Sequence, residues 1–503
     1  MKHTFNVNVK NVAVRGAILS FLITAALVAA CTARSGSNTA ASPGISLEAC
    51  QLTGPNGTLG RRAQCGSLRV YEDRDAGSGR QIDLHLAVIP AVSRSPQPDP
   101  LFILVGGPGE AATSSYSLIR SAFERINQRR DIILVDQRGT GKSNSLTCPT
   151  SEEEDYSSES DPEELREYAQ DCLAELEADP RFYTTSIAMD DLDEVRRGLG
   201  YEQINLYGIS YGSRAALVYL RQYPQQVRSL ILDGVAPPNW VLGPSAPADA
   251  QQAAEQILQR CSSDVDCGAA FPDVQASFDR VFARLREQPA QLSLQHPISG
   301  ETIDFTLTAD FLASTIHGMT YAPETAALLP LMVHIAHSQS DYSSLAAFGL
   351  SYLDTVGGAM STGMRFSVIC AEDVPMYEQQ EMLEGYLGDS IVASFTEICK
   401  VWPQGQVPEG YHQAVSSTVP VLLLSGEADP VTPPTNAELA AQTLPNSLHI
   451  IAPGQGHGNI MRGCIPVLAA DFIDAGSIQG LNTECVQNLR PPPFFISFAG
   501  PAP

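Results

Sequence analysis

Positive charge is scarce in this sequence of 503 residues. The chain carries 31 Lys and Arg against 56 Asp and Glu, which gives a formal net charge of −25. A protein this acidic repels phosphate backbones and anionic lipid headgroups. Neither nucleic acid nor a membrane surface held by charge alone is therefore an expected partner. We expect the acids to lie scattered over a solvated surface.

Metal and nucleotide motifs are also missing. No group of Cys, His and Asp has the spacing of a zinc site, so neither a metal nor a cofactor is expected. His334 and His337 lie in an apolar helical run, where packing or surface positions are much commoner than a metal pair. The stretch 139–143 looks like a phosphate loop, but that motif needs glycine at position 136, where Asp136 stands.

A membrane-spanning segment is not expected either. The apolar run at residues 16–30 follows Lys2, Lys10 and Arg15, with no acid before it. The run is too short to span a bilayer comfortably. A charged start followed by a short apolar run is typical of an export signal, which we exclude from the fold.

The end of this run has a second feature. It closes with Leu27-Val28-Ala29-Ala30-Cys31, and small residues followed by cysteine resemble the cleavage box of bacterial lipoproteins. The resemblance implies a signal peptide at 1–30, a lipid on Cys31 and a flexible tether at 31–48, rich in Ser, Ala and Thr. The residue after the cysteine is Thr32 and not Asp, which resembles lipoproteins that are sorted to the outer membrane. The protein would then face the periplasm or the cell surface. Ordinary signal cleavage beside an incidental cysteine is the alternative.

The cysteine count agrees with export. Ten cysteines remain once Cys31 is set aside, and an even number in an oxidising compartment predicts disulfides. The sequence does not fix their connectivity, and we expect nearest neighbours to pair. The expected pairs are Cys50–Cys65, Cys148–Cys172, Cys261–Cys267, Cys370–Cys399 and Cys464–Cys485.

The most informative stretch of the chain is Gly208-Ile209-Ser210-Tyr211-Gly212. A strand-like run precedes it at 204–207, and a helical pattern follows at 214–220. A sharp turn between strand and helix lifts a serine hydroxyl clear of the sheet, and only small residues fit two positions either side of it. The pattern predicts that Ser210 is a nucleophile.

A serine nucleophile needs a histidine base and a carboxylate that orients it. In this architecture the acid and then the histidine follow the serine along the chain. Asp429 follows the strand-like run 420–424, and His457 follows another at 447–451. Both loops would open at the carboxyl edge of a parallel sheet, where active sites lie. Glu427 is the competing acid, while His449 alternates with apolar residues and is expected to be an ordinary strand residue.

A glycine-rich loop supplies the remaining part of the predicted active site, the oxyanion hole. The strand-like run 101–105 opens into Gly106-Gly107-Pro108-Gly109. We expect the backbone N–H groups of Gly107 and Tyr211 to form an oxyanion hole, the second at a helix N-terminus. No cysteine lies beside Ser210, so a thiol nucleophile is not expected.

These motifs carry a family resemblance. The glycine loop, Asp136-Gln137-Arg138-Gly139-Thr140-Gly141-Lys142-Ser143 and the serine motif resemble the prolyl and tripeptidyl aminopeptidases of the α/β-hydrolase fold. Val105 stands where proline iminopeptidases usually carry histidine, so the chain looks closer to the tripeptidyl branch. The resemblance implies an exported serine exopeptidase that removes short N-terminal units, aminoacyl to tripeptidyl, through an acyl-enzyme. Asp136 and Arg138 are expected to brace their loop.

The order of elements agrees with an α/β-hydrolase fold, a mostly parallel sheet flanked by helices. Strand-like runs are expected at 67–71, 82–89, 101–105, 132–135, 204–207 and 230–232. From 238 to 417 the pattern is mainly helical, as at 250–261, 276–287 and 326–337, which predicts a cap domain inserted after the sixth core strand. The expected core is 49–237 with 418–503, the latter ending in a C-terminal tail.

An aminopeptidase must also bind a free α-ammonium, and a sheltered carboxylate would do so. Glu372 and Asp373 in the cap are the leading candidates, and Glu110 is the next; each is equally compatible with a surface position. An esterase or lipase with the same triad is the alternative function, because the fold hosts both. A non-catalytic peptide-binding surface lipoprotein is the alternative of another class. The oligomeric state is unknown.

Overall fold

The computed structural model describes residues 44–54, 59–148 and 161–501. The expected signal peptide, most of the tether and Cys31 lie outside these residues. Within the described ranges, no helix combines the length and the apolar character that crossing a membrane requires. From Ser42 onward the chain forms one unit.

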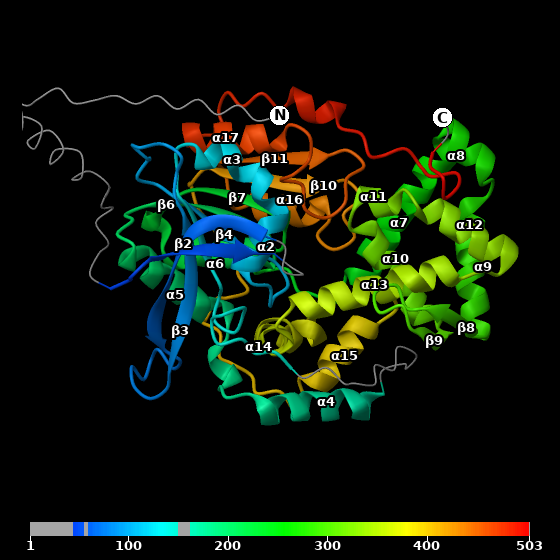
Figure 1. Ribbon diagram of the computed structural model, residues 1–503, viewed down its shortest axis with the longest axis horizontal. Coiled ribbons are helices and arrows are strands. Elements are labelled where there is room, and N and C mark those ends of the chain that lie inside the picture. Colours follow the sequence, from blue (N-terminus) through cyan, green and yellow to red (C-terminus); the bar gives the residue numbers. More distant parts are fainter. Residues whose placement is uncertain (1–43, 55–58, 149–160, 502–503) are drawn as a thin grey trace, which may run out of the picture. The chain divides into compact units, whose positions relative to one another are not determined.

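A nine-stranded sheet organises this unit, in the order β1-β2-β3-β5-β4-β6-β7-β10-β11 (Figure 1). The six strands from β5 to β11 in that order pair in parallel, whereas β1, β2 and β3 pair antiparallel with their neighbours. The predicted mostly parallel sheet is confirmed. The strands are β1 (Glu48–Thr53), β2 (Leu59–Tyr71), β3 (Gln81–Ile89), β4 (Leu101–Leu104), β5 (Ile132–Val135), β6 (Ile204–Ser210), β7 (Val227–Val235), β10 (Val421–Gly426) and β11 (Ser447–Ala452).

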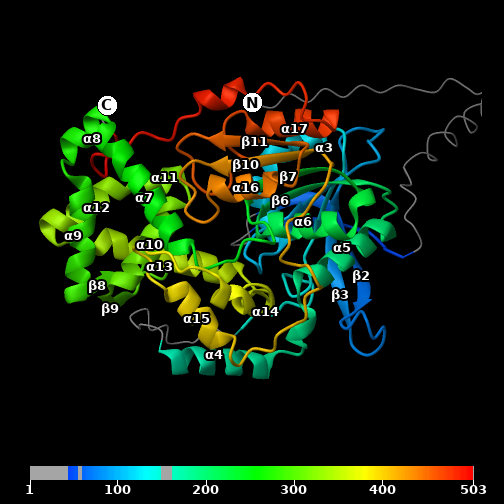
Figure 2. The same cartoon turned by 180° about the vertical axis from the view of Figure 1, so that it is seen from behind.

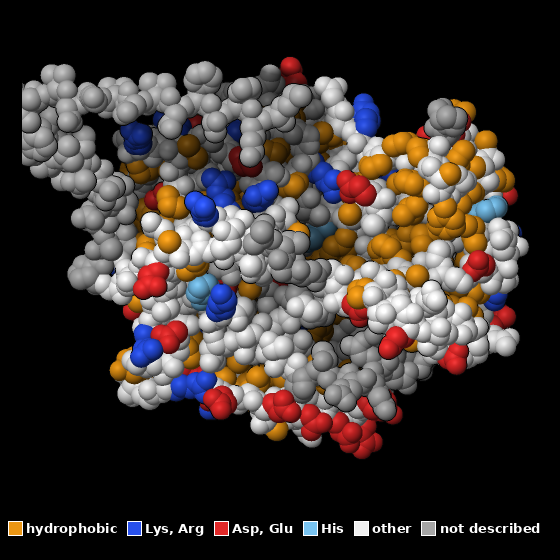
Figure 3. Space-filling model, viewed as in Figure 1, with side chains coloured by type: hydrophobic (Ala, Val, Ile, Leu, Met, Phe, Trp, Pro, Cys, Tyr) orange, Lys and Arg blue, Asp and Glu red, His pale blue; other side chains and the backbone are white. Residues whose placement is uncertain are grey.

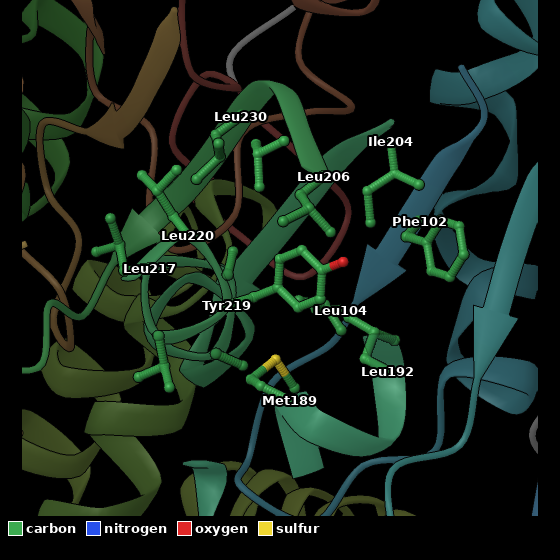
Figure 4. Close-up of a cluster of buried hydrophobic side chains, with 14 of the residues drawn as sticks. Phe102, Leu104, Met189, Leu192, Ile204, Leu206, Leu217, Tyr219, Leu220 and Leu230 are labelled. Atoms are coloured by element: carbon green, nitrogen blue, oxygen red, sulfur yellow. The ribbon is translucent and has the colours of Figure 1, made fainter. Parts of the chain in front are cut away.

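Helices cover both faces of the sheet because successive side chains of its buried strands point to opposite sides. Phe102 and Leu104 face α5 (Thr185–Gly198) and α6 (Tyr211–Gln222) in one apolar cluster, shown in Figure 4. Leu101 and Ile103 face the other side. There they pack with α2 (Ala112–Ile119), α3 (Glu124–Asn127) and α17 (Ile465–Ala475).

The mainly helical insertion lies between β7 and β10, beside the sheet (Figures 1 and 2). It has its own apolar core, which the C-terminal tail joins through Phe494. It also contains an antiparallel pair, β8 and β9, that the helical pattern did not predict. The elements are α7 (Ala246–Ser263), α8 (Val265–Ala270), α9 (Val274–Glu287), β8 (Ala290–Gln295), β9 (Thr302–Leu307), α10 (Ala309–Thr320), α11 (Pro323–Ala326), α12 (Leu329–Gln339), α13 (Ser343–Ala359), α14 (Thr362–Glu372), η5 (Val374–Gln379) and α15 (Ser390–Ile398).

Two features differ from the expected core. Strand β1 was not predicted, so the insertion follows the seventh strand in chain order, not the sixth. Helix α4 (Pro162–Glu175) leaves the first part of the core and packs with α15. Its acids Glu163, Glu164 and Glu167 are exposed, and acidic side chains gather along that edge in Figure 3. The remaining short helices are η2 (Arg120–Phe123), η3 (Pro180–Phe182), η4 (Pro224–Gln226), α16 (Pro434–Ala441) and η6 (Glu484–Asn488).

Five disulfides join the nearest-neighbour pairs expected from the sequence: Cys50–Cys65, Cys148–Cys172, Cys261–Cys267, Cys370–Cys399 and Cys464–Cys485. Each closes a short loop, of 6 to 29 residues in sequence separation. Cys148–Cys172 ties α4 to the rest of the chain. The cross-links suit an oxidising compartment.

The loop after β5 is braced as expected. Asp136 accepts hydrogen bonds from the backbone N–H groups of Thr113 and Lys142, at 2.9 and 3.2 Å. Arg138 is buried and forms a two-pronged ion pair with Asp191, with N–O distances of 2.6 and 2.8 Å. Both residues therefore hold the backbone beside the site.

Candidate active site

Ser210 ends β6 and Tyr211 begins α6. The serine has φ 56° and ψ −127°, a strained backbone that lifts the side chain at the strand-to-helix turn. The two flanking glycines are required by close approaches. A Cβ on Gly208 would lie 2.3 Å from the carbonyl oxygen of Gly212, and one on Gly212 would lie 2.3 Å from that of Leu104.

His457 and Asp429 form a hydrogen-bonded pair on the loops after β11 and β10. Nδ1 of the histidine lies 2.9 Å from Oδ2 and 3.1 Å from Oδ1 of Asp429. The buried carboxylate also accepts the hydroxyl of Thr432 at 2.9 Å and the N–H groups of Val431 and Thr432, both at 2.9 Å. This arrangement fixes the plane of the imidazole and leaves Nε2 for a second partner.

The protonation states follow from these contacts. Burial alone raises the pKa of Asp429, but the charge and hydrogen bond of His457 and the two N–H donors outweigh it, so this pKa is lowered. Burial alone lowers the pKa of His457, but Asp429 and the more distant Asp233 and Glu110 outweigh it, so this pKa is raised. The histidine therefore stabilises a positive charge better than an isolated imidazole.

Two residues that the sequence did not single out hold the histidine loop. The N–H of His457 donates to the carbonyl of Tyr321 at 2.8 Å, and the two rings meet edge to face at 5.4 Å between centroids. Asp233, within β7, is buried and accepts the N–H groups of Asn459 and Ile460, each at 2.8 Å. The sequence signal that could have identified Asp233 is the presence of an aspartate inside the apolar run 230–235.

One cavity brings the predicted residues together. Ser210 and His457 line a cavity of about 440 Å³ together with Gly107 and Glu110. The cap contributes other lining residues of this cavity, among them His317, Tyr321, Tyr352, Met360 and Arg365. A smaller adjoining pocket is lined by Ser210, Gly107 and Tyr211. The two expected oxyanion donors thus lie beside the serine.

Gly107 stands at a position in its loop that only glycine can occupy without strain. Its φ is 108°, and a Cβ there would lie 2.6 Å from the backbone nitrogen of Gly109. A Cβ on Gly106 would lie 3.6 Å from Oγ of Ser210 and 3.7 Å from Oε1 of Glu110. The serine hydroxyl and the Glu110 carboxyl therefore flank the same backbone position.

Glu110 is a partly buried acid on the cavity wall. Its Oε2 accepts the hydroxyl of Ser115 at 3.2 Å, and no Lys or Arg is paired with it in the described chain. Burial raises the pKa of Glu110, while the hydrogen bond from Ser115 and the charge of His457 act in the opposite direction. An acid in such a setting gains much from a cationic ligand.

The carboxylates of Glu372 and Asp373 are buried, and both already have partners within the protein. Glu372 accepts the N–H and hydroxyl of Thr185 at 2.7 and 2.9 Å, and the hydroxyl of Tyr411. Asp373 forms a two-pronged ion pair with Arg214, at 2.9 and 3.1 Å, and accepts the N–H of Leu242 at 2.8 Å. Of the two, only Asp373 lines the smaller pocket.

The competing residues lie elsewhere. Glu427 is exposed and accepts the N–H of Gly454 at 2.7 Å. His449 bonds Ser425 at 2.9 Å on β11, and the ring of His334 lies 5.1 Å from that of Phe271. The described residues include no group of three or more His, Cys, Asp and Glu side chains that could hold a metal ion.

Two family models match the chain on either side of most of the cap. The model described as alpha/beta hydrolase fold matches residues 99–266, and the one described as TAP-like protein matches residues 385–485. The first stretch contains the glycine loop and Ser210, and the second contains Asp429 and His457.

The chain is also similar to named peptidases, over most of its length in one case and over a part of it in another. The serine protease Hip1 of Mycobacterium tuberculosis is 22% identical over 87% of this chain and 90% of its own length. A tripeptidyl aminopeptidase of Streptomyces coelicolor is 28% identical over 40% of this chain and 39% of its own length. The crystal structure of a Mycobacterium smegmatis proline iminopeptidase covers 82% of this chain and 98% of that chain, with 17% identity and a TM-score of 0.40. The chain is a serine hydrolase of the α/β-hydrolase fold that resembles the tripeptidyl and prolyl aminopeptidases.

Proposed function

We propose that the protein is a serine exopeptidase that removes short units, aminoacyl to tripeptidyl, from peptide N-termini. The observation that carries the proposal is one cavity that holds Ser210, the Asp429-oriented His457 and the partly buried acid Glu110. The first two supply acyl transfer. The third supplies a site for the free amine that distinguishes an aminopeptidase from other serine hydrolases.

The proposed chemistry is acyl transfer in two halves. Ser210 Oγ attacks the scissile carbonyl carbon while Nε2 of His457 takes the hydroxyl proton. The N–H groups of Gly107 and Tyr211 stabilise the oxyanion. His457 then gives its proton to the leaving amine, which departs and leaves the N-terminal unit as an ester on Ser210. Water then attacks that ester while His457 takes a proton from it, and His457 returns this proton to Ser210 Oγ as the N-terminal unit leaves as a carboxylic acid.

Glu110 is the acid that we assign to the substrate's α-ammonium. It faces the cavity, flanks the same position as Ser210 and has no cationic partner in the described chain. Asp373 already forms an ion pair with Arg214, and Glu372 is already hydrogen-bonded to Thr185 and Tyr411. These two acids support the cap wall in this proposal, and Glu110 completes the recognition site.

Export and anchoring form the second part of the proposal. Residues 1–30 act as a lipoprotein signal peptide, Cys31 carries the lipid, and the residues that follow tether the enzyme to the outer membrane. The tether ends before the expected position 48, because Ile45 is buried in the core and Glu48 begins β1. Five disulfides in the folded part support an oxidising compartment. The segment 238–417 acts as a cap that shelters the site from water.

A panel of chromogenic amides tests the proposal. Aminoacyl, dipeptidyl and tripeptidyl amides are offered with free and acetylated N-termini, beside short acyl esters. We expect hydrolysis of free-amine amides and much weaker use of their acetylated partners. Hydrolysis of esters alone would make the protein an esterase. No hydrolysis, together with no labelling by a fluorophosphonate, would favour a non-catalytic binding protein.

A further inference from the structure

Arg365 is a cation on the substrate cavity's cap wall that has no acidic partner in the described chain. It lies in the first turn of α14 and lines the same cavity as Ser210 and His457. Its Nη1 lies 3.1 Å from the sulfur of Met360, and its guanidinium carbon lies 5.5 Å from the ring centroid of Phe395. Neither neighbour supplies a negative charge.

The four arginines of the described chain that are almost completely buried are each paired with an acid. Arg138 pairs with Asp191, and Arg214 pairs with Asp373. Burial lowers the pKa of the Arg365 guanidinium, while Tyr321, Tyr352 and Tyr377 act in the opposite direction. A guanidinium fork that is partly withdrawn from water is poised to take a two-pronged acceptor.

We propose that Arg365 binds a carboxylate of the peptide substrate and makes the enzyme favour carboxylate-bearing peptides. The proposal rests on the proposed peptidase function. The carboxylate has two possible sources, an acidic side chain near the scissile bond or the C-terminus of a short peptide. Both present the same planar pair of oxygens.

The backbone joins the two charged positions of the cavity. Glu110 forms an isolated antiparallel bridge with Met360, and the N–H of Ser361 donates to the carbonyl of Gly109 at 3.0 Å. The glycine loop that carries Glu110 is therefore fastened to the start of the helix that carries Arg365. A peptide with a free ammonium and a nearby carboxylate therefore meets a charge of opposite sign for each group in the cavity that contains Ser210.

Matched peptides test the inference. Free-amine chromogenic amides with Glu or Gln at each position of the released unit form the first arm. Short peptides with a free or amidated C-terminus form the second. Wild type should prefer the carboxylate member of at least one arm about ten- to a hundred-fold in kcat/KM, and Arg365→Met should abolish that preference. Arg365→Lys should restore part of it.

The controls separate binding from folding. Arg286→Met removes an exposed cap arginine that lies over the ring of Phe282, and it should leave both arms unchanged. Thermal unfolding of Arg365→Met should match wild type, because methionine keeps the apolar part of the side chain. Wild type without a carboxylate preference, or equal losses by Arg365→Met on charged and neutral members, would overturn the inference.

Failure of the peptidase proposal gives a different result. In that case no peptide of the panel is cleaved, whereas activated acyl esters still are. The same variants are then tested on a p-nitrophenyl ester of succinic acid and on its uncharged butyric analogue. If wild type prefers the succinyl ester and Arg365→Met abolishes that preference, the result would show that Arg365 binds a carboxylate although the protein is not a peptidase. If wild type shows no preference for the succinyl ester, both proposals are refuted.

Discussion

Glu110→Gln isolates the proposed contact with the substrate's α-ammonium. The substitution keeps the size of the side chain and an oxygen for Ser115, but it removes the charge that faces the cavity. A hydrogen bond to a charged group contributes about 1.5–3 kcal/mol. At about 1.4 kcal/mol per decade, kcat/KM on free-amine amides should fall about ten- to a hundred-fold. Acetylated amides and acyl esters lack the ammonium and should change far less.

The pH dependence gives an independent check. Burial raises the pKa of Glu110, so this carboxylate gains its proton at a higher pH than an exposed glutamate does. Activity on free amines should therefore fall as the pH drops through that raised value, and Glu110→Gln should lose this part of the acid limb. The part due to protonation of His457 should persist in the variant.

Glu372→Gln is the matched contrast. Its carboxylate holds Thr185 and Tyr411 inside the protein, so the substitution should lower the unfolding temperature and reduce all substrates together. Equal losses by Glu110→Gln on free and acetylated substrates, or no loss on either, would refute the assignment of Glu110. Asp373, on the smaller pocket, would then be the next acid to test.

Two further predictions concern the triad and the anchor. Asp429→Asn should lower kcat about 10⁴-fold with little change in binding, because the amide favours the wrong histidine tautomer; Glu427→Gln should be mild, and the reverse order would show that the acid is wrongly assigned. Cys31→Ser should move the enzyme from the membrane fraction to the soluble periplasmic fraction with its activity intact, and unchanged lipid labelling in that variant would contradict the anchor.

Local patterns in the sequence were enough to predict most of the fold. The elbow at Ser210 is set by residues within five positions, and each disulfide joins neighbours along the chain. Strand β1 was missed because Glu48–Thr53 is only six residues long and mostly exposed, and it depends on pairing with β2. The hairpin β8–β9 was missed although AQLSLQ and TIDFTL both alternate apolar and polar residues, because the helical segments on either side led us to interpret the whole of 238–417 as mainly helical.

The parts of the site that were missed depend on contacts distant in sequence. Tyr321 meets His457 across the junction of cap and core, and Arg365 reaches the cavity only because α14 starts beside the glycine loop. Glu372 and Asp373 were expected at a recognition site on the strength of their charges. Their partners Thr185 and Arg214 lie far from them in sequence, and no local pattern reveals that pairing.

Covalent labelling of Ser210 tests the central claim most directly. A fluorophosphonate reacts with a serine whose proton a nearby base accepts. Mass spectrometry of the labelled wild type should place one adduct on the peptide that contains Ser210, and Ser210→Ala should show none while keeping its thermal unfolding temperature. The same variant should lose about 10⁶-fold in kcat. An adduct on another residue, or comparable turnover by Ser210→Ala, would contradict the account.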